Sequence, residues 1–151
     1  MKKWISIMLC FILCLGLENK VLAADYNEYV DGSYLTNDDS SEVTVGATTR
    51  GVYLGSGSST INKQGTGKIG AGGNTVGRKV VDKISVVVQV ERLVGGYWRT
   101  YGSAWTATNY NSAYVSTSKV KTVPTGYYYR VVCTHYANSD VSYSFTNGIY
   151  I

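Results

Sequence analysis

Cys133 and His135 are the residue types in this sequence best suited to nucleophilic catalysis, because a thiol and an imidazole can exchange a proton. They lie two positions apart in a β-branched and aromatic stretch, Tyr127–His135, and so share one face of the strand that this stretch predicts. Their backbone positions would be ~6.5–7 Å apart, and no adjacent acidic residue would orient the imidazole. We therefore interpret Cys133 as a core side chain and predict no catalytic residue.

Other catalytic and metal-binding patterns are equally weak. With a single histidine and no second cysteine after the N-terminal segment, the chain lacks a set of zinc ligands. Glu91 and Asp140 could supply the two carboxylates of a glycosidase, yet nothing in the sequence pairs them. The acidic cluster at 37–42 lacks the glycine and the ligand spacing of a calcium loop. We therefore predict a non-enzymatic protein with no metal and no cofactor.

Aromatic residues give the positive signal, since all 14 tyrosines follow the N-terminal segment, together with Trp98 and Trp105. Tyrosine combines a flat apolar ring with a polar tip, which suits both strand packing and contact surfaces. Strict alternation along the predicted strands places some of these rings outside the core, where exposed aromatic surface marks a contact site. The ligand-binding residues predicted in this way are Trp98, Tyr97, Tyr128 and Tyr136.

The central strand Tyr127–His135 positions Tyr128 and, directly after its last residue, Tyr136. A turn with Pro124 and Gly126 introduces the strand. Its odd-numbered residues form the better core face, and its even-numbered residues, with Arg130 among them, face outward.

A predicted hairpin positions the other two rings. Lys83–Leu93 is the strongest strand, and Gly95–Gly96 forms a tight turn into the returning segment Tyr97–Tyr110. A two-residue loop sets Trp98 beside Leu93 on the outer face.

Strand candidates with glycine or asparagine turns between them fill the chain from residue 43 onward, and no segment has a helical apolar period. This pattern predicts an all-β fold, namely an antiparallel β-sandwich of about six to eight strands in two sheets. A closed β-barrel is the alternative.

The N-terminus is typical of a secretory signal peptide over residues 1–23. Lys2 and Lys3 precede an apolar run at 4–17, which is shorter than the ~20 residues that span a bilayer, and Ala23 ends a cleavage-site pattern. Residues 24–42 contain no basic residue, and we expect a flexible acidic arm. Residues 43–151 then form a single domain, which must be stable without a disulfide because only Cys133 remains.

Cleavage also removes three of the 14 basic residues and one of the 10 acidic residues, which leaves a net charge near +2. This charge is too small to indicate binding to nucleic acid, or to an anionic membrane once the signal is cleaved. The oligomeric state is open.

Four segments together resemble a family of small secreted proteins of Gram-positive Firmicutes, a family of unknown function. The rhythm Pro-x-Gly-x-Tyr-x-x-Val also resembles the strand entry of immunoglobulin-like and fibronectin-like sandwiches, without the Cys and Trp spacing of true immunoglobulin domains. The resemblance implies export and a β-sandwich, and no activity. The segments are Arg50–Leu54, Val90–Leu93 with Gly96–Trp98, Gly126–Val131 with His135, and Thr146–Ile151.

Three functions follow from these patterns. The first is a secreted, extracellular, non-enzymatic protein that binds a glycan or cell-surface polymer through exposed aromatic residues. The second is a structural or matrix protein that self-associates through sheet edges. The third is an extracellular hydrolase, which would need a cleft with convergent polar groups.

Overall fold

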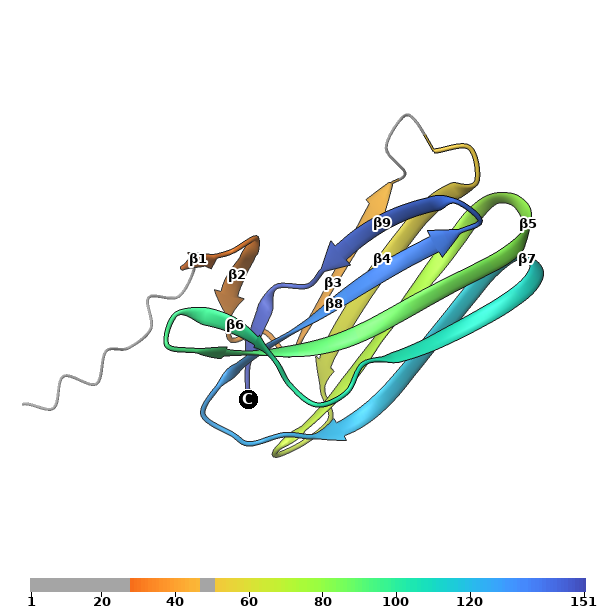
Figure 1. Cartoon of the computed structure of the whole chain (residues 1–151). Helices are drawn as coiled ribbons and strands as arrows, with labels where there is room; N and C mark the ends of the chain where they lie inside the picture. Colours follow the sequence, from red (N-terminus) through yellow and green to blue (C-terminus); the bar gives the residue numbers. More distant parts are fainter. Residues whose placement is uncertain (1–27, 47–50) are drawn as a thin grey trace, which may run out of the picture.

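The computed structural model of the chain describes residues 28–46 and 51–151, and within these ranges every regular element is a β-strand (Figure 1). No helix of these ranges is long and apolar enough to cross a membrane. The all-β prediction is therefore confirmed. The strands are β1 (Tyr29–Val30), β2 (Ser33–Thr36), β3 (Ser40–Gly46), β4 (Leu54–Lys63), β5 (Lys68–Val94), β6 (Tyr97–Thr100), β7 (Trp105–Thr122), β8 (Tyr128–Ala137), β9 (Asp140–Phe145) and β10 (Gly148–Tyr150).

These ten strands form one mixed sheet, where the sequence predicts six to eight strands in two antiparallel sheets. The main order is β1-β2-β10-β8-β5-β4-β3, while β6 and β7 also pair with β5, and β9 pairs with β8. All pairs are antiparallel except β10 with β2.

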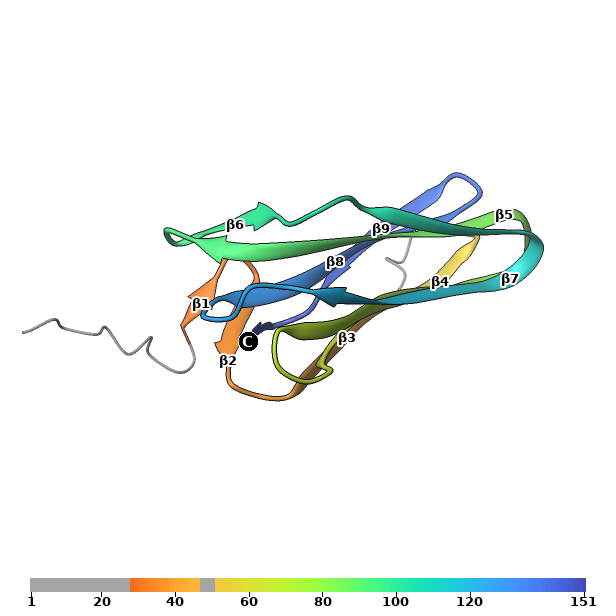
Figure 2. The same ribbon diagram turned by 90° about the horizontal axis from the view of Figure 1, so that it is seen from below.

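The long strand β5 organises the sheet. Its first half pairs with β4 and with the second half of β7, and its second half pairs with β8 and with the first half of β7. The β5–β7 register shifts between Val76 and Val81, and Asn111 on β7 has a positive φ of 48°. The two-stranded ribbon bends there, so the sheet curls into a half-barrel with a concave inner face and a convex outer face (Figures 1 and 2).

The core fills the inner face of the curled sheet. Alternate residues of β5 point inward, as the period of two predicts, and they meet the odd-numbered residues of β8, whose core role is confirmed. The largest fully buried apolar side chains are Leu35, Ile61, Ile69, Ile84, Val86, Val88, Val90, Val115, Tyr129, Val131 and Ile149.

The hairpin turn is also where the sequence predicts it. Gly95 and Gly96 both have positive φ, 61° and 81°, which is the backbone of a type I′ turn and favours glycine. Leu93 accordingly pairs with Trp98 across β5 and β6.

The expected flexible arm is the main correction, because residues 29–30, 33–36 and 40–46 form strands of the sheet. β2 pairs in parallel with β10 and buries Leu35, which is 2% exposed. A polar, acidic composition concealed this pairing, since the tertiary partner lies more than 100 residues away in the chain. The predicted signal peptide and the start of the arm, residues 1–27, lie outside the described residues.

Candidate binding site

Trp98 lies on the outer side of the β5–β6 hairpin, as predicted, but its ring is half-buried rather than free. Its indole N–H donates to the carbonyl of Val30, 3.0 Å away, and the guanidinium of Arg130 lies 4.6 Å from the ring centroid. A side chain at Gly148 would approach the indole within 2.7 Å. The expectation of an exposed Trp98 is wrong because the N-terminal strands cover this end of the outer face.

Tyr128 is also covered, with 8% of its surface exposed, although its outward orientation on β8 is as predicted. Its ring packs edge-to-face on that of Tyr150, with centroids 5.1 Å apart. These two residues face each other in the β8–β10 pair, so the neighbouring strand supplies the packing that the sequence did not reveal.

The cover over this end of the outer face centres on Arg130, which is 6% exposed although the alternation placed it in solvent. Its Nε donates to Glu91 at 2.8 Å, and its Nη1 donates to the carbonyl of Asp31 and to the hydroxyl of Ser33. The guanidinium also lies between the rings of Trp98 and Phe145. The buried charge is thus fully paired, which is the condition for burying it.

The other two predicted residues are exposed. Tyr97 is 67% exposed at the tip of the hairpin, and Tyr136 is 40% exposed near the end of β8. They lie at different ends of the molecule and on different faces of the sheet, so the four predicted residues do not form one site.

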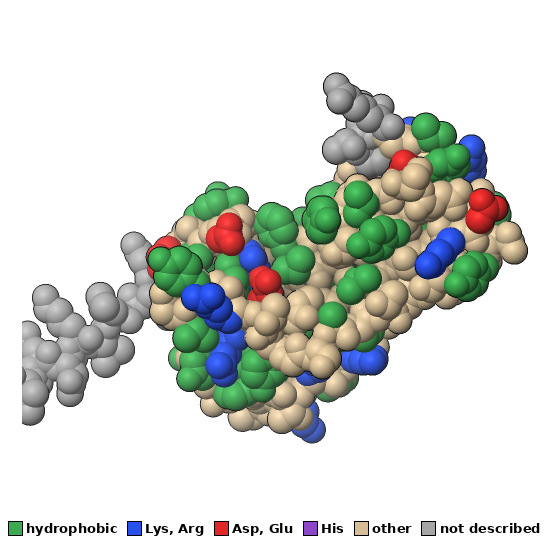
Figure 3. Space-filling view, in the orientation of Figure 1, with side chains coloured by type: hydrophobic (Ala, Val, Ile, Leu, Met, Phe, Trp, Pro, Cys, Tyr) green, Lys and Arg blue, Asp and Glu red, His purple; other side chains and the backbone are tan. Residues whose placement is uncertain are grey.

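Around Tyr136 the structure adds apolar residues that sequence reasoning missed. Val141, Tyr143 and Phe145 on β9 point outward with exposed fractions of 48%, 61% and 37%. Val141 pairs with Tyr136 and Tyr143 with Thr134, so these side chains continue one surface. Figure 3 shows hydrophobic side chains gathered over β8 and β9 on this face. We call the set Tyr136, Val141, Tyr143 and Phe145 the aromatic face.

The strand β9 is inverted relative to the usual pattern. Its apolar residues alternate with Ser142 and Ser144, and alternation normally turns the apolar residues into the core. Here Ser144 is 1% exposed and points inward, and the rings point to solvent. The sequence shows that apolar residues alternate with serine along this strand, but it does not show which of the two sets faces the core.

A buried histidine explains the inversion. His135 is fully buried; its Nε2 lies 2.7 Å from the Ser144 hydroxyl and its Nδ1 2.9 Å from the Thr75 hydroxyl. Because the Thr75 hydroxyl donates to the carbonyl of Ser85, it must accept from Nδ1–H, and Nε2 then accepts from Ser144. Burial lowers the pKa of His135 from 6.5 to about 4, against a smaller opposing effect from the Asn74 backbone. The imidazole is therefore neutral, and it needs serine rather than an apolar residue beside it.

This Ser144–His135–Thr75 arrangement has the distances of a nucleophile and base but no access to a substrate, since all three side chains are buried. Cys133 is no better placed. Its thiol points to the carbonyl of Gly72, 3.6 Å away, and burial raises its pKa to about 12. A thiol with this pKa is protonated at neutral pH and unreactive.

The two carboxylates considered for glycosidase chemistry are both engaged in structural contacts. Glu91 accepts the hydrogen bond from Arg130. Asp140 accepts hydrogen bonds from the backbone N–H groups of Tyr53 and Leu54 at 2.7 and 3.0 Å, and the Leu54 and Tyr53 bonds lower the pKa of Asp140. Among the described residues no group of three or more His, Cys, Asp or Glu could hold a metal ion.

Two shallow pockets lie on the outer faces. One, of about 200 Å³, adjoins the aromatic face and is lined by Lys83, Ser85, Tyr136 and Asn138. It combines one ring with an ammonium, a hydroxyl and an amide, the mixture that orients a small polar ligand.

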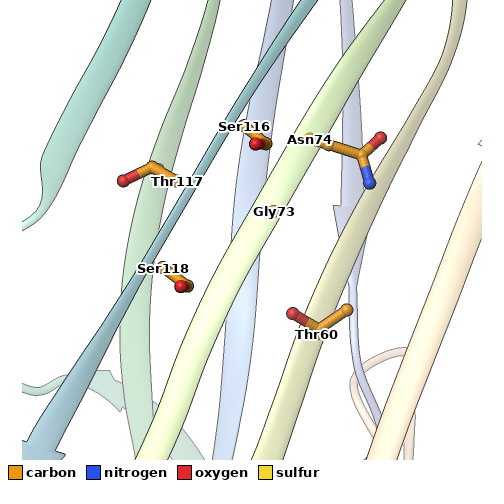
Figure 4. Close-up of a pocket in the computed structure, with 6 residues that line it drawn as sticks. All are labelled: Thr60, Gly73, Asn74, Ser116, Thr117 and Ser118. Carbon is orange, nitrogen blue, oxygen red and sulfur yellow. The ribbon is translucent and has the colours of Figure 1, made fainter.

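The other pocket, of about 250 Å³, lies across β4, β5 and β7 and is lined by Thr60, Gly73, Asn74, Ser116, Thr117 and Ser118 (Figure 4). Figure 4 shows Ser116 and Ser118 on the side of β7 toward β5 and Thr117 on the opposite side. The side chains that line it bear only hydroxyl and amide groups, which can form hydrogen bonds but offer neither a charge nor a ring to hold a ligand.

Comparison with known proteins gives one match. The model of a family of unknown function (DUF6147) matches residues 18–149. No curated protein and no solved structure matches the chain. The expectation of a family of unknown function is confirmed, whereas Firmicute origin and export stay predictions.

Proposed function

The chain belongs to DUF6147, and we propose that it is an exported, non-enzymatic protein that binds an extracellular glycan or cell-surface polymer on its aromatic face. We also propose that the curled sheet is best described as a sandwich whose two layers share β5 and β7. Export rests on the signal-like segment at 1–23.

The inverted strand β9 is the observation that carries the proposal. Its rings would be buried in an ordinary strand, yet here Tyr143 and Val141 stand in solvent beside Tyr136. Contiguous exposed apolar surface of this kind usually marks a contact site. The flat apolar faces of sugar rings match tyrosine rings, whose hydroxyls can also form hydrogen bonds.

The adjoining pocket supports a polar ligand rather than a purely apolar one. Lys83 and Asn138 can bond sugar hydroxyls while the Tyr136 ring packs against the ring carbons. Asn138 is held in place, because its side-chain oxygen accepts from the backbone N–H of Lys83 at 3.1 Å. Its fixed orientation favours recognition with little loss of side-chain freedom.

Binding of the mature protein to insoluble chitin, cellulose and peptidoglycan tests the proposal. Tyr143→Ala should weaken binding to the polymer that is retained by about tenfold or more and leave the melting temperature unchanged. Tyr114→Ala is the matched control, because Tyr114 is 50% exposed on β7 away from the aromatic face. Equal binding by the two variants, or no binding to any of the three polymers, contradicts the proposal.

Self-association through a sheet edge is the second candidate, because β5 is the one partner of β7 among the described strands and the other edge of these 18 residues is open there. Lys119 and Lys121 lie at inward-facing positions of its second half, a device that discourages edge pairing. Sedimentation of the mature protein across concentrations tests this candidate, and a strict monomer excludes it.

A further inference from the structure

Four cations on the inner side of the curled sheet each lie over an aromatic ring. The guanidinium of Arg92 lies between two tyrosines, 4.6 Å from the Tyr127 ring centroid and 5.3 Å from that of Tyr101. The remaining pairs are Arg99 over Tyr97, Lys119 over Trp105 and Lys121 over Trp105, at 5.5, 5.3 and 5.0 Å. We call these four cations with their rings the basic strip.

None of the four cations forms an ion pair with a carboxylate of the described residues. The ion pairs found there join Lys63 to Asp39, and Arg130 to Asp31 and Glu91. The reason is visible in the sequence, which has five Lys or Arg and no Asp or Glu between residues 92 and 139. Of these five, Arg130 alone has a carboxylate partner within residues 28–46 and 51–151.

The strip is continuous across three strands, β5, β6 and β7, and the loop between β6 and β7. Arg92 and Arg99 are directly opposite each other in the β5–β6 pair. The loop after β6 then connects them to the lysines, because a side chain at Gly102 would lie 3.3 Å from the ammonium of Lys121. That ammonium also donates to the carbonyl of Ser103 at 3.2 Å.

Its place in the fold leaves the strip open. Arg92 continues the inward-facing row that ends the core at Val90, so it belongs to the concave side of the sheet. β4 pairs with the other half of β5, and the β5–β6 hairpin projects past β4 toward one end of the molecule (Figure 2). Arg99 and Tyr97 are exposed as a result, and Tyr127 is 38% exposed.

Two like charges opposite each other on paired strands destabilise the pair. Tyrosine rings offset part of this repulsion and hold the Arg92 guanidinium in a defined plane. An oxyanion placed between Arg92 and Arg99 would remove the repulsion and accept charge-assisted hydrogen bonds from both planar forks. An anion would thus supply the negative charge that no carboxylate of the described residues brings to Arg92 and Arg99.

We infer that the basic strip binds the anionic groups of an acidic polysaccharide, with sugar rings against the exposed tyrosines. The shared chemistry is a carboxylate or phosphate repeated along a glycan. The inference rests on the proposed function in taking the polymer to be a glycan, but the strip is separate from the aromatic face. A glycan is favoured over nucleic acid because the mature net charge near +2 is small for a protein that tracks a phosphate backbone.

The experiment compares binding of the mature protein to four soluble polymers at about 50 mM salt, where charge contacts are weakly screened. Polygalacturonic acid carries carboxylates, poly(glycerol phosphate) teichoic acid carries phosphates, and dextran is neutral. Single-stranded poly(dT) tests nucleic acid. We expect binding to at least one acidic glycan, weakening as salt rises, and a higher melting temperature in its presence.

The variant Arg92→Gln/Arg99→Gln should lose about tenfold or more of this affinity. Lys79→Gln should lose little, because Lys79 is also an exposed cation over a ring, 4.9 Å from the Tyr53 centroid, but lies outside the strip and the aromatic face. The single variant Arg99→Gln should also weaken binding. It provides a test even if the double variant misfolds, because Arg99 is exposed and its replacement should not disturb the fold. Tyr143→Ala should retain acidic-glycan binding by the strip even if it abolishes binding by the aromatic face. Equal affinity for dextran, tighter binding to poly(dT), or unchanged affinity in both arginine variants overturns the inference.

Discussion

The outer face of the sheet carries aromatic side chains at both ends of β8, but they are covered at one end and exposed to solvent at the other. At the start of β8, the N-terminal strands and β6 cover Arg130 between Trp98 and Phe145. At its end, Tyr136 stands bare beside Val141 and Tyr143. The covered end shows that outward-facing rings become buried in this fold where another strand packs over them. The bare end has no such strand among the described residues, and its rings are available to a ligand.

The interior differs in the same way along β8. Beneath the covered end the inner residues are apolar, with Tyr129 and Val131 fully buried. Beneath the bare end lies the polar network of His135 with Thr75 and Ser144. At the bare end, polar side chains therefore lie inside and apolar side chains lie outside, which reverses the normal arrangement. Substitutions at each end should show how differently the covered and the bare end contribute to stability.

The largest effect is expected from Arg130→Ala at the covered end. The change removes the partner of Glu91, whose side chain is 19% exposed, and the contacts that hold Asp31 and Ser33. Breaking a mostly buried ion pair should lower the free energy of unfolding by about 3 kcal/mol or more, measured by urea denaturation. Arg99→Ala is the control, because Arg99 is exposed and forms no ion pair with the part of the chain that the structure describes. An equal loss in both variants would contradict the role of the cover.

Acid should lower the free energy of unfolding because His135, which lies beneath the bare end, is buried in its neutral form. The folded chain keeps this imidazole neutral down to about pH 4, whereas the unfolded chain protonates it near its ordinary pKa of 6.5. The unfolded state therefore binds more protons between these values, and stability falls as pH decreases from 6.5 toward 4. At ~1.4 kcal/mol per pKa unit, the loss should be about 3 kcal/mol.

The measurement is urea denaturation from pH 7 to 4. His135→Gln should be less stable at pH 7 and should lack this component of the pH dependence. Parallel pH profiles for the two proteins would show that another group causes the acid sensitivity.

Trp98→Ala should destabilise the fold by about 2–3 kcal/mol, below the range for a fully buried aromatic because the ring is half-buried. The change removes the hydrogen bond to Val30 and the packing against Gly148. Tyr97→Ala, at the exposed neighbouring position, should change the melting temperature little. If Trp98→Ala leaves stability unchanged, the cover does not depend on the indole.

The smallest of these effects is expected from Ser144→Ala. The change leaves Nε2 of the buried imidazole without its donor, which should lower the free energy of unfolding by about 1–2 kcal/mol. Ser142→Ala is the matched control on the same strand face, because the Ser142 hydroxyl has no hydrogen-bond partner within the described residues. A larger loss in Ser142→Ala than in Ser144→Ala would argue against the network as the cause of the inversion.

The sequence alone determined that the regular elements are β-strands, which residues of β8 face the core, and where the Gly95–Gly96 turn lies. These depend on local properties: β-branched and aromatic residues suit a pleated strand, the period of two is geometric, and two successive positive φ angles favour glycine. The structural role of Cys133 also followed, since its position on the core face buries the thiol.

Only the tertiary structure decided which outward-facing residues are covered. The partners of Arg130 include Asp31 and Ser33, which lie 99 and 97 residues away along the chain, and no local pattern reports them. The same is true of β9, where the hydrogen-bonding needs of His135 outweighed the burial of three apolar side chains. Alternation predicts that two faces differ, whereas the neighbour against each face decides which of them is inside.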